Sequence, residues 1–357
     1  MRPFGLYILG LCFVTSCGPT TRIIEEPTDS RPDSGSSSLF TGNLSDAGVA
    51  EIIFDAGSSP NCDLDGDGYD SDACAGTDCN DNDPLIHPQA RERCSFIDEN
   101  CDGNNNEFLD CSFMAAGPYD LYRVDPFEPK VEWLSNVQNS NSSGGMLDID
   151  IDTNGNLVIV KKEGLYELSA NGDLVATEGF EDENGQSVEL SPYTNGMAIN
   201  SAGTLFLTDS EEDRSTTPYS SVASAQTVQT QTGVISELGS LAPYVSSGDC
   251  VALKNDSILM TAHYPSDQEG TDLLVFVNSD TAQTTLIGDT GYSKIFGLSA
   301  SFGLLFGVTE DAKILQINAE NGASTLLLDC SEEEQPGCPA PPSGEDRLRF
   351  WGAANGD

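Results

Sequence analysis

Short runs of alternating apolar and polar residues recur from residue 112 to the C-terminus, separated by turns rich in Gly, Asn and Asp. Half-buried strands show this alternation, and Asn-Gly or Asp-Gly dipeptides favour tight hairpins. The pattern predicts an all-β region in which an apolar strand meets a turn and is followed by a second strand. Five segments share this theme: 146–162, 195–209, 247–262, 295–311 and 350–357.

The spacing of these segments predicts how the strands are grouped. Their starts lie about 50 residues apart, near the length of a four-stranded propeller blade with long loops. Segment 350–357 has an inner strand without outer strands, whereas 120–135 has outer strands without an inner pair. Joined, they complete one mixed blade and remove exposed sheet edges. We therefore predict a mainly β fold with a C-terminal five-bladed β-propeller. Six blades remain open if 214–232 holds strands, and a β-sandwich would explain neither the period nor the complementary ends.

Residues 62–111 differ in kind from the β region. They contain six Cys and 14 acidic side chains against two Arg, with very few apolar residues. So small a core cannot stabilise a block of this length. Disulfides and bound cations must therefore supply the missing stability.

The first acidic loop, DLDGDGY, has the spacing of a calcium loop. Asp63, Asp65 and Asp67 occupy positions 1, 3 and 5, Gly at position 6 permits a tight turn, and the carbonyl of Tyr69 falls at position 7. Cys74 stands where an EF-hand has its Glu, which favours a loop-only site. The remaining oxygen ligands are then expected from Asp70, Asp72 or Asp78.

Two further clusters of oxygen ligands follow in the chain. The first consists of Asp78, Asn80, Asp81 and Asp83, and the second of Asp98, Asn100, Asp102 and Asn106. Hard oxygen donors at this density favour calcium. The alternatives are a solvated acidic loop without metal, and zinc on Cys residues whose spacing lacks the usual two-residue gap.

The run DLDGDGY…TDCNDNDPLIHPQARERC…DENCDGNNNE resembles the MopE-type metal-binding motif of bacterial surface proteins and, more distantly, thrombospondin type-3 calcium repeats. The resemblance implies metal binding by residues 62–111. Copies in the family often occur in tandem, but here there is one, with Asn106-Glu107 where Asp-Glu is common. The family's copper activity uses an oxidised Trp. The block has no Trp and only one His, His87, so we expect calcium rather than copper.

The N-terminus indicates export. Arg2 and a short apolar run precede Val14-Thr15-Ser16-Cys17, which resembles a bacterial lipobox. The resemblance implies a signal peptide at 1–16, lipidation of Cys17 and a membrane anchor, and Gly18 favours the outer membrane or cell surface. The alternative is an ordinary signal peptide cut nearby. The expected domains are then 1–16, a flexible tether at 17–61, the acidic module at 62–111 and the propeller at 112–357.

Export also predicts disulfides. Six Cys in the acidic module allow 15 pairings, which sequence alone cannot distinguish. Cys330 and Cys338 flank a short loop and are expected to pair with each other. Cys250 is then left as a buried thiol.

The charge and the motifs limit the functions available. A formal net charge of −43 argues against nucleic-acid binding and favours cationic partners or divalent ions. We find no hydrolase elbow, zinc-protease motif, phosphate loop or dinucleotide fingerprint. Asn195-Gly196-Met197-Ala198 with Thr208-Asp209-Ser210 is similar to a blade signature of gluconolactonase-type propellers, and the resemblance implies a channel cation held by Asn195 and Asp249. We predict a non-enzymatic, calcium-binding surface lipoprotein whose propeller binds a protein or glycan. The alternative is a metal-dependent, gluconolactonase-like hydrolase.

Overall fold

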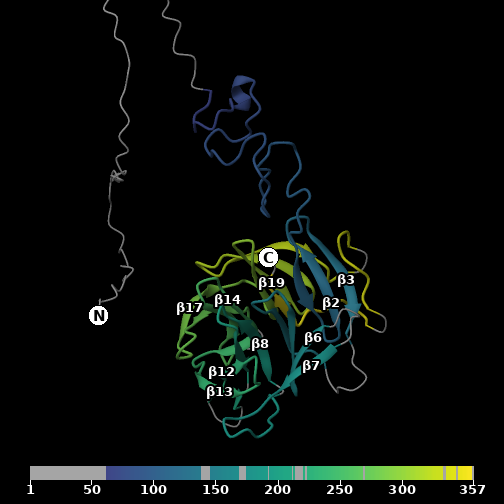
Figure 1. Ribbon diagram of the computed structural model, residues 1–357, viewed down its shortest axis with the longest axis vertical. Coiled ribbons are helices and arrows are strands. Elements are labelled where there is room, and N and C mark those ends of the chain that lie inside the picture. Colours follow the sequence, from purple (N-terminus) through teal and green to yellow (C-terminus); the bar gives the residue numbers. More distant parts are fainter. Residues whose placement is uncertain are drawn as a thin grey trace, which may run out of the picture. The chain divides into compact units, whose positions relative to one another are not determined.

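The alternating segments form strands, as the sequence pattern predicts (Figure 1). The computed structural model describes residues 62–137, 145–168, 174–191, 193–210, 212–213, 220–221, 223–267, 270–332, 335–342 and 345–355. The predicted lipobox and tether, including Cys17, lie outside the described residues. All of these described residues belong to one compact unit. Within the described ranges, no helix has the length and apolar character needed to cross a membrane.

Five four-stranded antiparallel sheets form the blades of a propeller. The mixed blade consists of β22 (Gly352–Ala354), β1 (Phe113–Ala116), β2 (Asp120–Asp125) and β3 (Lys130–Asn136). The next consists of β4 (Asp148–Ile151), β5 (Leu157–Lys161), β6 (Gly164–Leu168) and β7 (Leu174–Gly179). The third consists of β8 (Thr194–Ile199), β9 (Thr204–Asp209), β12 (Ser224–Gln229) and β13 (Ile235–Ser240).

The other two blades follow the same plan. One consists of β14 (Val245–Ala252), β15 (Ile258–His263), β16 (Leu273–Val277) and β17 (Thr284–Asp289). The last consists of β18 (Ile295–Ser301), β19 (Leu304–Thr309), β20 (Lys313–Ile317) and β21 (Ser324–Asp329). A short pair, β10 (Glu212–Asp213) and β11 (Ser220–Ser221), lies outside the blades. The stretch 214–232 therefore supplies the third strand of one blade and no sixth blade in the described residues.

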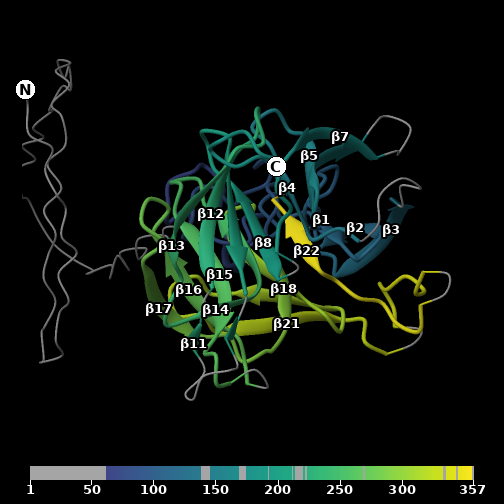
Figure 2. The ribbon, with the colours of Figure 1, turned by 90° about the horizontal axis from the view of Figure 1, so that it is seen from below.

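The inner strands close a ring around the centre of the propeller. β4 contacts β8, β8 contacts β14, β14 contacts β18, and β22 contacts both β18 and β4. Figure 2 shows β22, in yellow, beside β1 and close to β18. The prediction that the two ends of the β region share a blade is confirmed, since β1 pairs with both β2 and β22.

Close approach of the inner strands depends on glycine. A Cβ at Gly297 would lie 2.7 Å from the backbone of Gly352, and a Cβ at Gly352 would lie 2.1 Å from a carboxylate oxygen of Asp148. Real side chains do not reach such distances, so neither position admits a larger residue without movement. These contacts bring the mixed blade against its neighbours at the centre.

The apolar core lies between the blades. Five clusters of buried side chains each combine residues from two adjacent blades, such as Phe113 with Phe306, or Val160 with Leu205. The inner strand β8 and the second strand β15 are buried along most of their length, whereas the outermost strands β17 and β21 are half-buried or exposed at every position. In every blade the pairing of the third and fourth strands contains a register shift. Such bulges increase the twist of a sheet.

The predicted disulfide of the propeller region forms. Cys330 and Cys338 are bonded to each other, as the sequence analysis expected, and Cys250 is a free, buried thiol on the inner strand β14. Burial raises the pKa of the Cys250 thiol well above its usual value. This thiol is therefore an unreactive core group.

Candidate metal centre

The acidic module is held by disulfides rather than by a core. The described residues of the module contain one helical element, the 3-10 turn η1 (Asp72–Cys74), and most of their apolar side chains are exposed. All six cysteines are paired: Cys62–Cys74, Cys79–Cys101 and Cys94–Cys111. No thiolate is left in the module for zinc, so any metal here must be bound by other atoms, chiefly oxygen.

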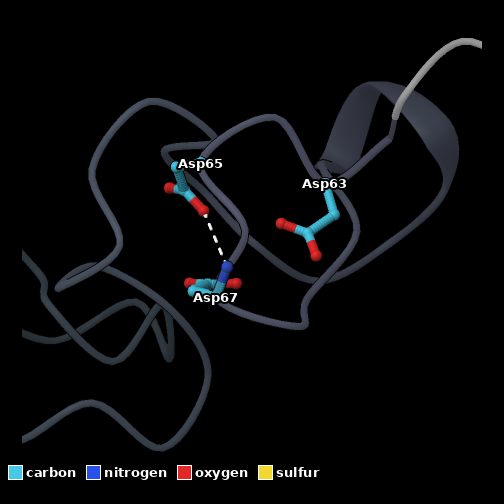
Figure 3. Close-up of side chains that lie close together, drawn as sticks. All are labelled: Asp63, Asp65 and Asp67. Carbon is cyan, nitrogen blue, oxygen red and sulfur yellow. Dashed lines mark hydrogen bonds between the residues drawn. The ribbon is translucent and has the colours of Figure 1, made fainter. Parts of the chain in front are cut away.

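The first loop curls around its own carboxylates (Figure 3). Asp63 accepts backbone N–H groups from Gly66 at 2.7 Å and Gly68 at 3.1 Å, and both glycines have positive φ. Asp65 accepts the N–H of Asp67 at 3.2 Å, and Asp67 accepts the N–H of Tyr69 at 2.8 Å. The alternating spacing therefore turns three carboxylates toward one point, as expected for a calcium loop.

Oxygen atoms without partners mark this point. In the described part of the chain, two groups of three carboxylates converge, with one oxygen of each within 4.8 Å of the others. They are Asp63, Asp65, Asp67 and Asp65, Asp78, Asp81. Asp65, Asp67 and Asp78 each have a buried Oδ2 that makes no hydrogen bond. Buried carboxylate oxygens without donors are costly, and a cation satisfies them directly.

Asp65 links the two groups, so the first loop and the segment after η1 build one centre. The side chain of Asp81 also accepts the N–H of Leu64 at 2.7 Å, which fixes the two segments together. Burial and the neighbouring carboxylates raise the pKa of Asp65. The site thus gathers negative charge that a bound cation would neutralise.

The second loop repeats this hydrogen-bond pattern. Asp98 accepts N–H groups from Asp102 at 3.2 Å and Gly103 at 2.7 Å, and Asp102 accepts the N–H of Asn104 at 2.9 Å. The Asn100 side chain donates to Glu107 Oε1 at 2.6 Å, and Glu107 Oε2 is buried without a hydrogen bond. Glu107 was not among the ligands predicted from sequence, although it lies three residues after Asn104 in the same acidic run.

The module also contains carboxylates that hold the backbone. Buried Glu92 accepts the N–H groups of Asn100 at 2.9 Å and Asn106 at 2.8 Å, and buried Glu99 accepts the hydroxyl of Ser95 at 2.8 Å. Both oxygen and nitrogen of the Asn106 side chain bond to Ser95. The structure thus places Asn106 as a link between two segments, while its predicted role as a ligand stays a prediction.

Three further predicted ligands, Asn80, Asp83 and Tyr69, make contacts within the acidic module. Asp83 accepts the N–H of Leu85 at 3.1 Å, and the N–H of Asn80 donates to Asp78 at 2.8 Å. The ring of Tyr69 stacks on His87, with centroids 4.8 Å apart. His87 Nδ1 lies 3.1 Å from the carbonyl of Pro88, which occupies this nitrogen.

Comparison with known families bears on this module. Residues 78–107 match the MopE copper-binding family model, described as "Putative metal-binding motif". The chain therefore contains a MopE-type metal-binding motif followed by a five-bladed propeller. The match begins after Asp63, Asp65 and Asp67, although Asp65 shares a centre with Asp78 and Asp81. No curated protein matches the chain.

Several solved structures are similar to the chain in fold. An auxiliary nutrient binding protein from Bacteroides ovatus has 11% identity over 60% of this chain and a TM-score of 0.36. This chain covers about half (54%) of that protein's length. A nidogen/laminin complex has 12% identity, 68% and 97% coverage and a TM-score of 0.41. The calcium-binding protein regucalcin from Agrobacterium tumefaciens has 11% identity, 57% and 65% coverage and a TM-score of 0.34. The propeller itself is established by the sheets of this chain.

The centre of the propeller holds a second set of buried acids. Asp249 accepts backbone N–H groups from Cys250 at 2.6 Å and from the neighbouring inner strands, at Leu298 (2.5 Å) and Met197 (3.4 Å). Burial raises its pKa well above the usual value, and these hydrogen bonds oppose that effect. Asn195 instead donates to the carbonyl of Ser246 at 3.2 Å. Asp249 thus ties three inner strands together, in a role that the sequence analysis did not foresee.

Proposed function

We propose that this protein is a lipid-anchored bacterial surface protein whose acidic module binds calcium and whose propeller presents a surface to a partner. The calcium proposal is carried by two convergent carboxylate groups that share Asp65, and in these groups Asp65, Asp67 and Asp78 each have a buried oxygen without a hydrogen bond. Calcium takes six to eight oxygen ligands in flexible geometry, and carboxylates at alternate positions supply them.

The donor set favours calcium over copper or zinc. Copper and zinc prefer imidazole and thiolate ligands, whereas the module offers paired cysteines and a single His whose Nδ1 is already occupied. Magnesium needs near-ideal octahedral geometry and dehydrates reluctantly, which suits a crowded carboxylate cage poorly. Bound calcium would cancel repulsion among the acids and stiffen a module that has almost no apolar core.

Calorimetry tests calcium binding directly. We expect the ectodomain, residues 18–357, to bind calcium, and we expect the variant Asp65→Asn/Asp98→Asn to lose most of that binding. Limited proteolysis should cut the module faster in chelator than in calcium, because carboxylate repulsion then opens the loops. Equal protease resistance in both conditions would contradict the proposal.

The anchor is tested separately. We propose lipidation at Cys17, because an apolar run and small residues precede it in the order that a lipobox requires. Cys17→Ser should release the protein from the membrane fraction while leaving calcium binding unchanged. Retention of the variant in membranes would show that another feature holds it there.

A binding role for the propeller is favoured over hydrolysis. The lactonase alternative needs Asn195 and Asp249 to hold a catalytic cation, but Asp249 already accepts three backbone N–H groups. Both carboxylate oxygens of Asp249 are occupied in this way, whereas Asp65 and Asp67 of the acidic module each keep one oxygen without a hydrogen bond. Lactone hydrolysis by the ectodomain that is lost in Asn195→Ala would overturn this part of the proposal.

A further inference from the structure

The mouth of the propeller's centre contains a cavity to which all five blades contribute. Its volume is about 230 Å³. The lining residues come from the starts of the inner strands or from the residues just before them: Leu147, Thr194, Asn195, Ser247, Gly248, Phe296 and Trp351. A cavity with apolar walls and few polar groups is the usual form of a small-molecule site.

Two polar side-chain atoms of the lining residues make no hydrogen bond: Asn195 Oδ1 and Ser247 Oγ. The side-chain nitrogen of Asn195 donates to the carbonyl of Ser246, which fixes the amide orientation. Its Oδ1 is buried and makes no hydrogen bond. A buried acceptor without a donor is costly, so an N–H or O–H of a ligand that reached this oxygen would satisfy it.

Aromatic rings form part of the wall. Trp351 is 39% exposed although it adjoins the buried strand β22, and Phe296 lines the same cavity from the neighbouring blade. Aromatic faces attract cations, and Trp does so most strongly. An apolar ligand would bury surface against these rings, and a positively charged ligand would also gain the cation–π attraction.

The electrostatic surroundings favour a positive ligand. The protein has a formal net charge of −43, and the cavity's described lining contains no Lys or Arg. Asp148 and Asp249 follow the lining residues Leu147 and Gly248 in sequence and are buried, and burial raises the pKa of each well above its usual value, so this pair adds little negative charge. The potential that repels anions and attracts cations therefore comes from the net charge of the protein as a whole.

We propose that this cavity binds a small organic ammonium ion, with an N–H donating to Asn195 Oδ1 and the alkyl part packing on Trp351 and Phe296. The inference gives a ligand class to the binding role proposed for the propeller. It is independent of calcium binding by the acidic module, because none of the module's residues lines the cavity.

Fluorescence of Trp351 provides the test. Trp133→Phe leaves Trp351 as the single Trp, and this protein is titrated with n-butylammonium, once in calcium and once in chelator. We expect saturable binding that is the same in both conditions. n-Butanol has the same alkyl chain without the charge, and its affinity should be lower by at least about tenfold. Tetramethylammonium, which lacks an N–H donor, should also bind more weakly.

Calorimetry on single variants tests where n-butylammonium binds. Asn195→Ala and Trp351→Ala should each weaken n-butylammonium binding about tenfold. Tyr264→Ala removes an aromatic residue of the same 39% exposure from outside the cavity and should leave binding unchanged. Thermal unfolding midpoints check that each variant is folded. Absence of saturable binding, equal binding of n-butanol, or full binding by both cavity variants would each overturn the proposal.

Discussion

The carboxylates of Asp65 and Asp78 lie within 4.8 Å of each other, although the turn η1 separates them in the chain, and each has a buried oxygen without a hydrogen bond. Asp65 belongs to both convergent groups of the module. One cation at this position would therefore hold two segments of chain together. The fold of the module and its affinity for metal are thus coupled.

Asp65→Asn should weaken calcium binding more than any loss of a single charge elsewhere in the module. The amide keeps the shape of the side chain but removes a charged ligand from both carboxylate groups, so we expect a decrease in affinity of about tenfold or more. Calorimetry measures this decrease. Asp72→Asn is the matched control, since Asp72 is exposed and lies outside both groups. Equal losses in the two variants would indicate diffuse attraction without a defined site.

The disulfide Cys79–Cys101 joins the two halves of the module. Cys79 follows Asp78, and Cys101 lies between Asn100 and Asp102, so this bond connects the ligand-bearing segments directly. Cys79→Ser/Cys101→Ser should lower calcium affinity about tenfold, because the freed chain must be ordered again on binding. Cys330→Ser/Cys338→Ser removes a disulfide of the propeller region and should leave calcium affinity unchanged. Equal calcium affinities of the two variants would contradict this coupling.

The propeller could be predicted because its signals are local and repeated. Alternation marks the strands, and the period marks the blades, so five inner strands were located within a few residues. Two strands of the blades gave no such signal. β1 (Phe113–Ala116) reads FMAA without a preceding turn, and β12 (Ser224–Gln229) reads SAQTVQ, in which polar residues dominate. Both strands are defined by their neighbours in the blade, which a local pattern does not reveal.

The metal centre could be predicted only in part. The spacing of Asp63, Asp65 and Asp67 is local and indicates convergence. The joining of Asp65 to Asp78 and Asp81 depends on the disulfides and loop contacts, which sequence left among 15 pairings. The sequence also does not show which acids bind a cation and which only hold the backbone. Glu92, for example, accepts two backbone N–H groups.

Phe350→Ala should destabilise the propeller by opening the junction of its two ends. Phe350 is fully buried, and its ring meets the ring of Tyr122 edge-on, with centroids 5.4 Å apart. This contact packs the chain just before β22 against β2 of the same mixed blade. Removing a buried Phe costs about 3–5 kcal/mol. Urea unfolding followed by circular dichroism measures the loss. Phe108→Ala, at a fully exposed Phe, should change stability by less than about 0.5 kcal/mol. Similar stability in the two variants would show that closure does not depend on this contact.

Buried acids near the centre give the propeller an unusual dependence on pH. Burial raises the pKa of Asp150 to about 6 and that of Asp272 to about 7. It also raises the pKa of Asp148, next to Asp249, well above its usual value. The folded state therefore binds protons more tightly than the unfolded chain, in which Asp titrates near 3.9. The free energy of unfolding must therefore fall as pH rises from about 4 to about 7, and the whole decrease is present above that range.

Asp272→Asn should flatten this dependence. Each pKa unit corresponds to about 1.4 kcal/mol, so the decline in wild-type stability between about pH 5 and pH 7.5 should reach a few kcal/mol. The variant lacks one of the titrating groups, while its amide oxygen can still accept the N–H of Ile295, which lies 2.7 Å from Asp272 Oδ2. Urea unfolding in chelator at both pH values measures the difference.

Asp152→Asn is the control. Although burial raises the pKa of Asp152, hydrogen bonds from Asn156 and Asn154 hold it below its usual value, so it titrates outside this range. A wild-type stability that rises with pH in this range would contradict the assignment of the buried acids, as would an unchanged slope in Asp272→Asn.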